Sequence, residues 1–511
     1  MNILRQRFVL VLTFLTAAIV SSCTDKWADH NEITDPMLAV DLLAQINKDP
    51  DLSKFSEYLA KTGYDKVVAS SKSFTVWAPT NQALAALDAS VIGDDAKLKL
   101  FVGNHIANQL YLTTAPQPSM RIKTLNGKNV TFTGTTVEES AIAKADIYVG
   151  NGVIHVISQP IIPKQSIWEY LNSTSTLQKT ELISLNFSVQ DSSKAEQTGV
   201  DPVTGKPIYK PGTGIINSNR FLQRADISNE DSLYTYIVLS DAAFTAEKNK
   251  LQKYYNVSTV KDSTDSITRF HVIKDLAFKG VLSSDNFPGT VYSVRDSVKF
   301  RLLKSDVVET RKVSNGIVYV MSKINYDLGN GTYDPYTKIK PVLIQGENVA
   351  SNSFSVAGKT FSIRVRRNPD GSTFRDLNVV NHGTAGFTAR YRFNTNSVTY
   401  KVYWRVVRDY NLTYSGTATD LTWSPQKLAF KTAAATDFAL VAKPGAVPSA
   451  IPKTFLPDYS EVLLGNYAID KYYTNSTKSG AFDVYLVSNT TTTNGTNDLL
   501  LDYIKLVPIL P

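Results

Sequence analysis

Residues 74–84 read FTVWAPTNQAL, and this stretch decides the fold of the first half of the chain. Its first five residues are mostly apolar and favour β-structure, which is typical of a buried strand. Thr80 then offers a hydroxyl oxygen that can cap a helix beginning at Asn81. The stretch therefore predicts a core strand that passes directly into a helix.

The chain repeats this pattern further along. Residues 234–244 read YTYIVLSDAAF, with Ser240 in the place of Thr80. In each copy a histidine follows within an apolar segment, His105 in the first copy and His271 in the second. The two landmarks recur at offsets of 160 and 166 residues, so their order and spacing are nearly the same in both copies. Such self-similarity indicates a structural repeat.

A third landmark completes the repeat. Residues 151–158 read NGVIHVIS and return as NGIVYVMS in residues 315–322, an offset of 164 residues. Each Asn-Gly predicts a hairpin turn that leads into a core strand. Helical patterns such as Leu52–Leu59 lie between the landmarks, and this mixture predicts α+β packing. We therefore predict two homologous α+β domains, residues 37–165 and 166–330.

The landmarks of the first copy resemble the signature segments of fasciclin-like domains, whose first segment reads close to FTVFAPTNxAF. The second copy departs from that pattern: Val238 and Leu239 replace Ala-Pro, and Tyr319 stands where the first copy has His155. It also carries a polar insertion, about Asp191–Asn219. The resemblance implies compact α+β modules with a β-wedge and a helical layer, used for adhesion or interaction rather than catalysis.

From about residue 336 the pattern changes to alternating strands with one wet face. Turn signals such as NPDG in residues 368–371 separate these strands, and no segment has a convincing helical period. We predict that residues 336–511 form an all-β sandwich, jelly-roll-like, that follows the two tandem fasciclin-like domains. The expected strands are 361–366, 388–393, 398–407, 482–487 and a closing run at 499–508.

The N-terminus predicts export and a lipid anchor. Two arginines precede the apolar run Phe8–Val20, which is too short to span a bilayer and has the length of a secretory signal. The run ends in VSSC, which resembles the bacterial lipobox. Residues 1–22 are therefore a predicted lipoprotein signal peptide, Cys23 the lipidated residue, and residues 23–36 an acidic tether similar to surface-export signals of Bacteroides-group lipoproteins. The alternative is an ordinary signal peptide with a chance cysteine.

Composition limits the chemistry. Cys23 is the one cysteine among 511 residues, so a lipidated chain has no thiol for a disulfide, a metal site or a nucleophile. The net charge of +8 is modest and the Lys and Arg residues are scattered, which disfavours nucleic acid as a partner. The histidines show no metal-ligand spacing, so no metal or cofactor is expected. His105, His155 and His271 lie in apolar segments and are expected to be core residues satisfied by backbone groups.

Basic and aromatic side chains share one side of several predicted strands. We expect them to line one outer sheet surface that binds an anionic polysaccharide or an acidic protein; the alternative is a solvated sheet face. Trp404 points the other way and is predicted to be core. The candidate ligand-binding residues are Arg364, Arg366, Arg390, Arg392, Tyr403 and Arg405.

No catalytic constellation is recognisable, so we predict a non-catalytic lipoprotein that is anchored in the outer membrane and faces the cell exterior. By resemblance to Bacteroides-group lipoproteins, it serves a starch-utilisation-type (TonB-dependent) nutrient uptake system, where it binds a glycan or peptide beside an outer-membrane transporter and its capping lipoprotein. The alternative is a surface adhesin for host matrix, other cells or biofilm polymer. A hydrolase with an unrecognised site is a third possibility.

Overall fold

The computed structural model divides the chain into two compact units. The first comprises residues 1–170 with 228–232 and 312–315, and the second comprises residues 171–227, 233–311 and 316–511. The predicted signal peptide, Cys23 and most of the tether lie outside the described residues, in which no helix is both long and apolar enough to cross a membrane. The structure describes residues 35–510 except 115–118, 258–260, 350–353, 357–358, 360, 381, 408–425, 436, 441–458, 475–480 and 489–498.

A seven-stranded sheet, in the order β2-β1-β7-β6-β5-β4-β3, organises the first repeat. β1 and β7 are its parallel pair, and the other neighbours are antiparallel. One face of β1 packs Phe74 and Val76 against helices α3, α4 and α8, whereas Trp77 enters a second core with Phe132. The strands are β1 (Phe74–Pro79), β2 (Ile106–Asn108), β3 (Met120–Lys123), β4 (Asn129–Phe132), β5 (Thr136–Val137), β6 (Ser140–Val149) and β7 (Gly152–Ile157). The helices are α3 (Leu42–Lys48), α4 (Ser53–Thr62), α5 (Tyr64–Val68), α6 (Asn81–Leu84), α7 (Ala89–Ile92) and α8 (Asp95–Gly103), with a 3-10 turn at Pro50–Leu52.

The second repeat has the same strand order. Its sheet runs β13-β12-β17-β16, with β12 parallel to β17, as β2-β1-β7-β6 does in the first repeat. In both copies the residue after the core strand caps the next helix: the hydroxyls of Thr80 and Ser240 accept the N–H of Ala83 and Ala243. The predicted strand-to-helix pattern is therefore confirmed. The elements are α9 (Ile167–Ser173), α10 (Leu177–Ser184), β12 (Tyr234–Leu239), α11 (Asp241–Leu251), α12 (Lys261–Ile273), β13 (Ala277–Lys279), β14 (Val291–Tyr292), β15 (Lys299–Phe300), β16 (Val307–Val313) and β17 (Gly316–Met321).

A buried threonine occupies the same position in both core strands. Thr75 and Thr235 are fully buried, and each hydroxyl donates to a backbone carbonyl. Each hydroxyl also accepts a backbone N–H, from Tyr111 at 2.9 Å in the first repeat and from Leu282 at 2.8 Å in the second. A buried hydroxyl without partners would be costly, so this paired arrangement explains threonine in an otherwise apolar strand. Because their N–H groups bond to equivalent threonine hydroxyls, Tyr111 and Leu282 occupy equivalent positions in the two repeats.

Tyr319 takes over the hydrogen bond of the histidine that it replaces. In the first repeat, Nε2 of His155 lies 2.8 Å from the carbonyl oxygen of Tyr111. In the second repeat, the Tyr319 hydroxyl donates to the equivalent carbonyl, that of Leu282, at 2.7 Å. The replacement of histidine by tyrosine in the second repeat therefore keeps the hydrogen bond to this carbonyl.

The match between His105 and His271 was wrong. The His105 carbonyl accepts the N–H of Trp77, at 2.9 Å, and in the second repeat the corresponding bond joins the Ile237 N–H to Leu276, at 3.0 Å. Leu276 is thus the equivalent of His105, and His271 lies five residues earlier, within α12. A histidine in apolar surroundings was too weak a landmark to fix the register.

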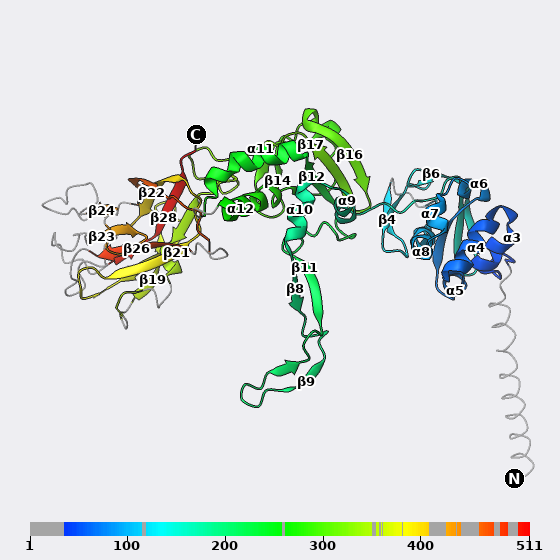
Figure 1. The fold of residues 1–511 in the computed structure, drawn as a ribbon, viewed down its shortest axis with the longest axis horizontal. Coiled ribbons are helices and arrows are strands. Elements are labelled where there is room, and N and C mark those ends of the chain that lie inside the picture. Colours follow the sequence, from blue (N-terminus) through cyan, green and yellow to red (C-terminus); the bar gives the residue numbers. More distant parts are fainter. Residues whose placement is uncertain are drawn as a thin grey trace, which may run out of the picture. The chain divides into compact units, whose positions relative to one another are not determined.

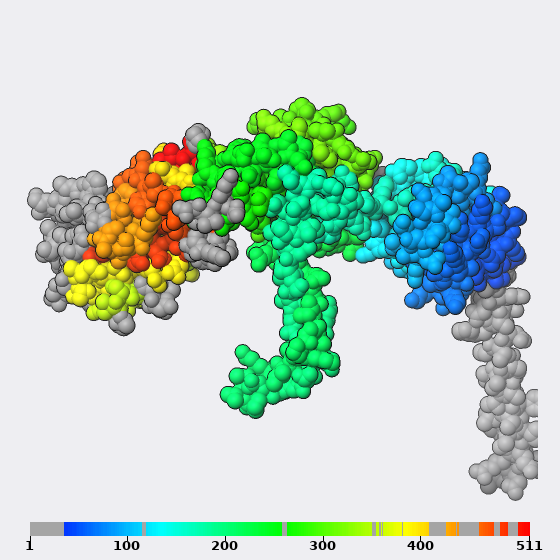
Figure 2. All heavy atoms as spheres, in the orientation of Figure 1, coloured from blue at the N-terminus to red at the C-terminus, as the bar shows by residue number. Residues whose placement is uncertain are grey.

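The polar insertion of the second repeat forms an arm of two small antiparallel sheets (Figure 1). Figure 2 shows it as a narrow projection from the second unit. Several of its apolar side chains are exposed, with Val203 the most exposed at 92%. Its strands are β8 (Asn186–Gln190), β9 (Gln197–Val200), β10 (Pro207–Tyr209) and β11 (Ile215–Asn219).

The C-terminal part of the second unit is built from antiparallel strands in three sheets around one apolar core. The sheets run β18-β28-β22-β25, β19-β20-β27 and β21-β26-β23-β24. Trp404 is 4% exposed within this core, as predicted. Asp502 divides the predicted closing run into two strands that enter different sheets. The strands are β18 (Val342–Gln345), β19 (Phe361–Arg367), β20 (Thr373–Val379), β21 (Thr388–Phe393), β22 (Thr399–Arg405), β23 (Gln426–Phe430), β24 (Phe438–Leu440), β25 (Val462–Ala468), β26 (Phe482–Ser488), β27 (Leu499–Leu501) and β28 (Tyr503–Pro508).

Candidate functional site

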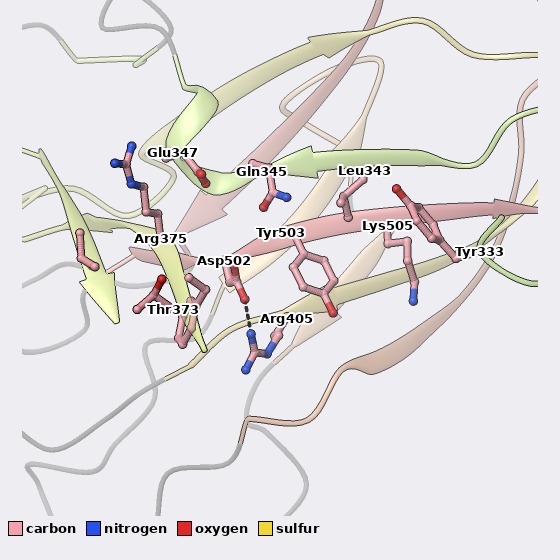
Figure 3. Close-up of a pocket in the computed structure, with 12 residues that line it drawn as sticks. Tyr333, Leu343, Gln345, Glu347, Thr373, Arg375, Arg405, Asp502, Tyr503 and Lys505 are labelled. Atoms are coloured by element: carbon pink, nitrogen blue, oxygen red, sulfur yellow. Dashed lines mark hydrogen bonds and ion pairs between the residues drawn. The ribbon is translucent and has the colours of Figure 1, made fainter. Parts of the chain in front are cut away.

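An open groove of about 620 Å³ crosses the C-terminal β-region (Figure 3). Strands β18, β22 and β28 supply one part of its lining and β19 and β20 supply another, while Tyr333 comes from the segment before β18. The lining combines apolar, aromatic, amide, hydroxyl and charged side chains. It consists of Tyr333, Leu343, Gln345, Glu347, Val365, Thr373, Phe374, Arg375, Arg405, Asp502, Tyr503 and Lys505.

Several contacts hold the side chain of Arg405 in place in the wall of the groove. Alternation along β22 buries Trp404 in the core and turns Arg405 outward. The guanidinium donates to the Tyr459 carbonyl at 2.8 Å, to the Asp502 carboxylate at 2.7 Å and to the Asn368 side chain. It also lies over the Phe374 ring, 4.5 Å from the centroid. Bonds in several directions and ring stacking hold its planar fork in one orientation.

Tyr503 and Lys505 project from the same side of β28, two residues apart. Both bind Glu461: the Tyr503 hydroxyl donates at 2.8 Å and the Lys505 ammonium lies 2.5 Å away. Burial and the Glu461 carboxylate raise the pKa of Tyr503, so its hydroxyl stays protonated. Lys505 also lies 4.7 Å from the ring centroid of Tyr403. These contacts order the middle of the groove.

The end of the groove away from Tyr333 carries two carboxyl groups, those of Asp502 and Glu347. Asp502 is 2% exposed, and burial raises the pKa of its carboxyl to about 6, although Arg405 acts to lower it. The carboxylates of Asp376 and Glu347 add to the increase. Glu347 Oε2 is buried and has no hydrogen-bond partner among the described residues. Figure 3 shows Glu347, Arg375, Thr373 and Asp502 on one side of Tyr503, and Tyr333 and Lys505 on the other.

The six predicted ligand-binding residues do not share one sheet surface. They lie on β19, β21 and β22, which belong to three different sheets. Arg405 lines the groove and Tyr403 contacts its lining residue Lys505. Arg364 pairs with the buried Asp376, and Arg392 pairs with Asp483 on the neighbouring strand β26. The predicted surface was wrong because strand alternation gives the side of a strand but not its sheet; ligand binding by these residues stays a prediction.

Several groove residues were missed. Tyr503 and Lys505 alternate with the buried Ile504 and Leu506, a pattern that was visible in the predicted closing run. No local signal pointed to Phe374 or Tyr333, because their position depends on which strands pair. The arrangement offers exposed ring and apolar surface together with fixed donors and acceptors, which is suited to holding an elongated polar ligand. Within the described ranges, no group of three or more His, Cys, Asp and Glu side chains is placed to hold a metal ion.

The sequence pattern of the Fasciclin domain matches residues 50–163. A fasciclin domain is present. The chain is 34% identical over 101 residues to the protein sll1483 of Synechocystis, a stretch that is 18% of this chain and 55% of that protein. The chain thus spans about half the length of this relative.

Two solved structures resemble larger parts of the chain. A fasciclin domain pair of the insect cell adhesion molecule fasciclin I covers 54% of this chain and 96% of its own, at 15% identity and a TM-score of 0.20. A β-1,3-glucan-binding module from Bacillus halodurans covers 32% of this chain and 95% of its own, at 14% identity and a TM-score of 0.19.

Proposed function

We propose that this chain is a surface lipoprotein, anchored through Cys23, that binds a glycan in the groove of its C-terminal β-region without transforming it. The observation that carries the proposal is the groove itself, in which exposed ring surface lies beside rigid donors and acceptors. Sugar rings present an apolar C–H face and a rim of hydroxyls, so they need this combination. An accessory role beside an outer-membrane transporter and its capping lipoprotein fits such a protein, because it holds the polymer at the cell surface.

Tyr333 gives the clearest test of the groove. Tyr333 is 42% exposed and lies at one end of the groove, so Tyr333→Ala removes contact surface without opening the core. Loss of one aromatic anchor costs about 1 kcal/mol or more, which weakens binding roughly fivefold or more. The measurement is affinity electrophoresis and titration calorimetry of the lipid-free protein against a polysaccharide panel. Tyr148→Ala, at a 46% exposed tyrosine of the first unit, is the matched control.

The fasciclin domain favours a second candidate, a surface adhesin. The two candidates differ in what deletion of the gene does. An uptake component is needed for growth on its polysaccharide and co-purifies with an outer-membrane transporter. An adhesin is needed for attachment to matrix, cells or biofilm polymer, and its loss leaves nutrient growth unchanged. Polysaccharide cleavage that is abolished by replacing one Asp or Glu would contradict both candidates.

A further inference from the structure

Two cations of the groove, Arg405 and Lys505, are already paired with carboxylates. Arg405 donates to Asp502 at 2.7 Å, and the Lys505 ammonium lies 2.5 Å from Glu461. An anionic ligand that approached either cation would meet the carboxylate that already holds it. The charges of Arg405 and Lys505 therefore fix the shape of the groove rather than attract an anion.

The third cation, Arg375, stands at the end of the groove away from Tyr333. It is exposed on β20, and Glu347 lies at the same end of the groove (Figure 3). Oε2 of Glu347 has no hydrogen-bond partner among the described residues, so an anion at this end of the groove would face an unpaired carboxylate oxygen. Among the described lining residues, with Glu461 added, three carboxylates stand against three cations, so these side chains together carry no formal net charge.

Uncharged contact surface accounts for much of the lining. Tyr333, Leu343 and Val365 are 42%, 38% and 69% exposed. Gln345 and Thr373 add neutral donors and acceptors beside them. We propose that the groove selects an uncharged glycan over an anionic one. This inference rests on the proposed function, since it names the ligand class of the same groove, and it differs from the anionic ligand expected from the arginine pattern.

The first experiment compares two classes of polysaccharide. Titration calorimetry and affinity electrophoresis use the lipid-free protein with soluble starch, mixed-linkage β-glucan, xylan and galactomannan, and with polygalacturonate and alginate, at low and high salt. We expect binding to a neutral polymer whose affinity changes less than about twofold with salt, because screening acts on charge pairs. Preferred binding of an acidic polymer, weakened by salt, overturns the inference and leaves the proposed function standing. Failure to bind any of the polymers overturns both.

The second experiment changes the charge of the groove. Glu347→Gln combined with Glu461→Gln leaves the groove with an excess of two positive charges. Affinity for polygalacturonate should then rise roughly tenfold at low salt and fall back at high salt. Circular dichroism and the thermal unfolding midpoint show that the double variant is folded. The control, Glu139→Gln with Glu196→Gln, removes two exposed carboxylates elsewhere. An equal gain in the control, or no gain in the groove variant, overturns the inference.

Discussion

His105 remains neutral because backbone groups use both of its ring nitrogens. The Ile161 N–H donates to Nε2 at 3.0 Å, so the proton sits on Nδ1, which donates to the Phe101 carbonyl at 2.8 Å. Burial lowers the pKa of His105 from 6.5 to about 4. As the pH falls, the unfolded chain takes up this proton first. The stability that the neutral ring contributes is therefore full above pH 6.5 and is lost between pH 6.5 and 4, by about 3 kcal/mol.

His105→Gln tests this expectation, because glutamine does not titrate. Urea unfolding of the first repeat, followed by tryptophan fluorescence, gives the free energy of unfolding of both proteins at neutral pH and near pH 4. The variant should have the lower free energy of unfolding at neutral pH. The difference in this free energy between the two proteins should shrink by about 3 kcal/mol near pH 4. His155, whose pKa burial also lowers, titrates equally in both proteins and cancels. A free-energy difference that does not change with pH would contradict the lowered pKa of His105.

The three histidines in apolar segments show which side-chain contacts can be predicted from the sequence. His105 and His155 bind backbone groups in the core, as the apolar runs around them predicted. His271 is buried as predicted, at 7% exposed, but its ring nitrogens bind no backbone group of the described residues. Its ring stacks on Tyr255, with centroids 3.8 Å apart, and its Nε2 lies 3.1 Å from the hydroxyl of Tyr472. That partner is 201 positions away, so no local pattern could reveal it.

Elements were predictable where the signal is local. The core strand β1, its Thr80 cap and the strands at 361–367 and 388–393 follow from alternation and capping chemistry. Their partners were not predictable. β22 pairs with β25 and β28, which lie more than 50 residues away along the chain, and these pairings decide which side chains meet in the groove. The location of the groove therefore required the folded structure.

Gly316 explains why the repeated Asn-Gly landmark needs its glycine. β17 begins there, beside β12, with a φ of +145°. A Cβ at this position would lie 1.9 Å from the carbonyl oxygen of Tyr234, so the parallel pair could not keep its spacing. We expect Gly316→Ala to destabilise the second repeat by about 3 kcal/mol or more, since strain and overpacking combine. Thermal unfolding of the full chain measures the change.

Gly289→Ala is the matched control for that change. It lies in the same unit, and an added Cβ would meet nothing within 4 Å. Its unfolding temperature should stay within about a degree of the unsubstituted chain, because exposed substitutions of this kind change stability by less than about 0.5 kcal/mol. Equal effects of the two substitutions would show that the close approach at Gly316 does not limit the fold.

Within the second unit, the second repeat and the C-terminal β-region share backbone hydrogen bonds. The Asn256 carbonyl accepts the N–H of Tyr472 at 2.5 Å, and the Asn256 N–H donates to the hydroxyl of Ser397 at 3.0 Å. The Ser397 N–H donates in turn to the Tyr254 carbonyl, also at 3.0 Å. Together with the stacked His271 ring, these bonds join the two parts directly. The groove therefore belongs to a structural unit that includes the second repeat as well as the β-region.

The attachment of the whole molecule depends, in our proposal, on Cys23. Two or more acyl chains on this residue make membrane binding effectively stable, whereas one chain or none does not. Cys23→Ser should therefore move the protein from the membrane fraction to the soluble fraction and leave its mass without lipid, as cell fractionation and mass spectrometry would detect. Ser21→Ala keeps a small residue two positions before Cys23 and should remain lipidated. Because the groove lies far along the sequence, the released variant should bind the same polysaccharide with unchanged affinity. Unchanged membrane retention of Cys23→Ser would disprove the anchor.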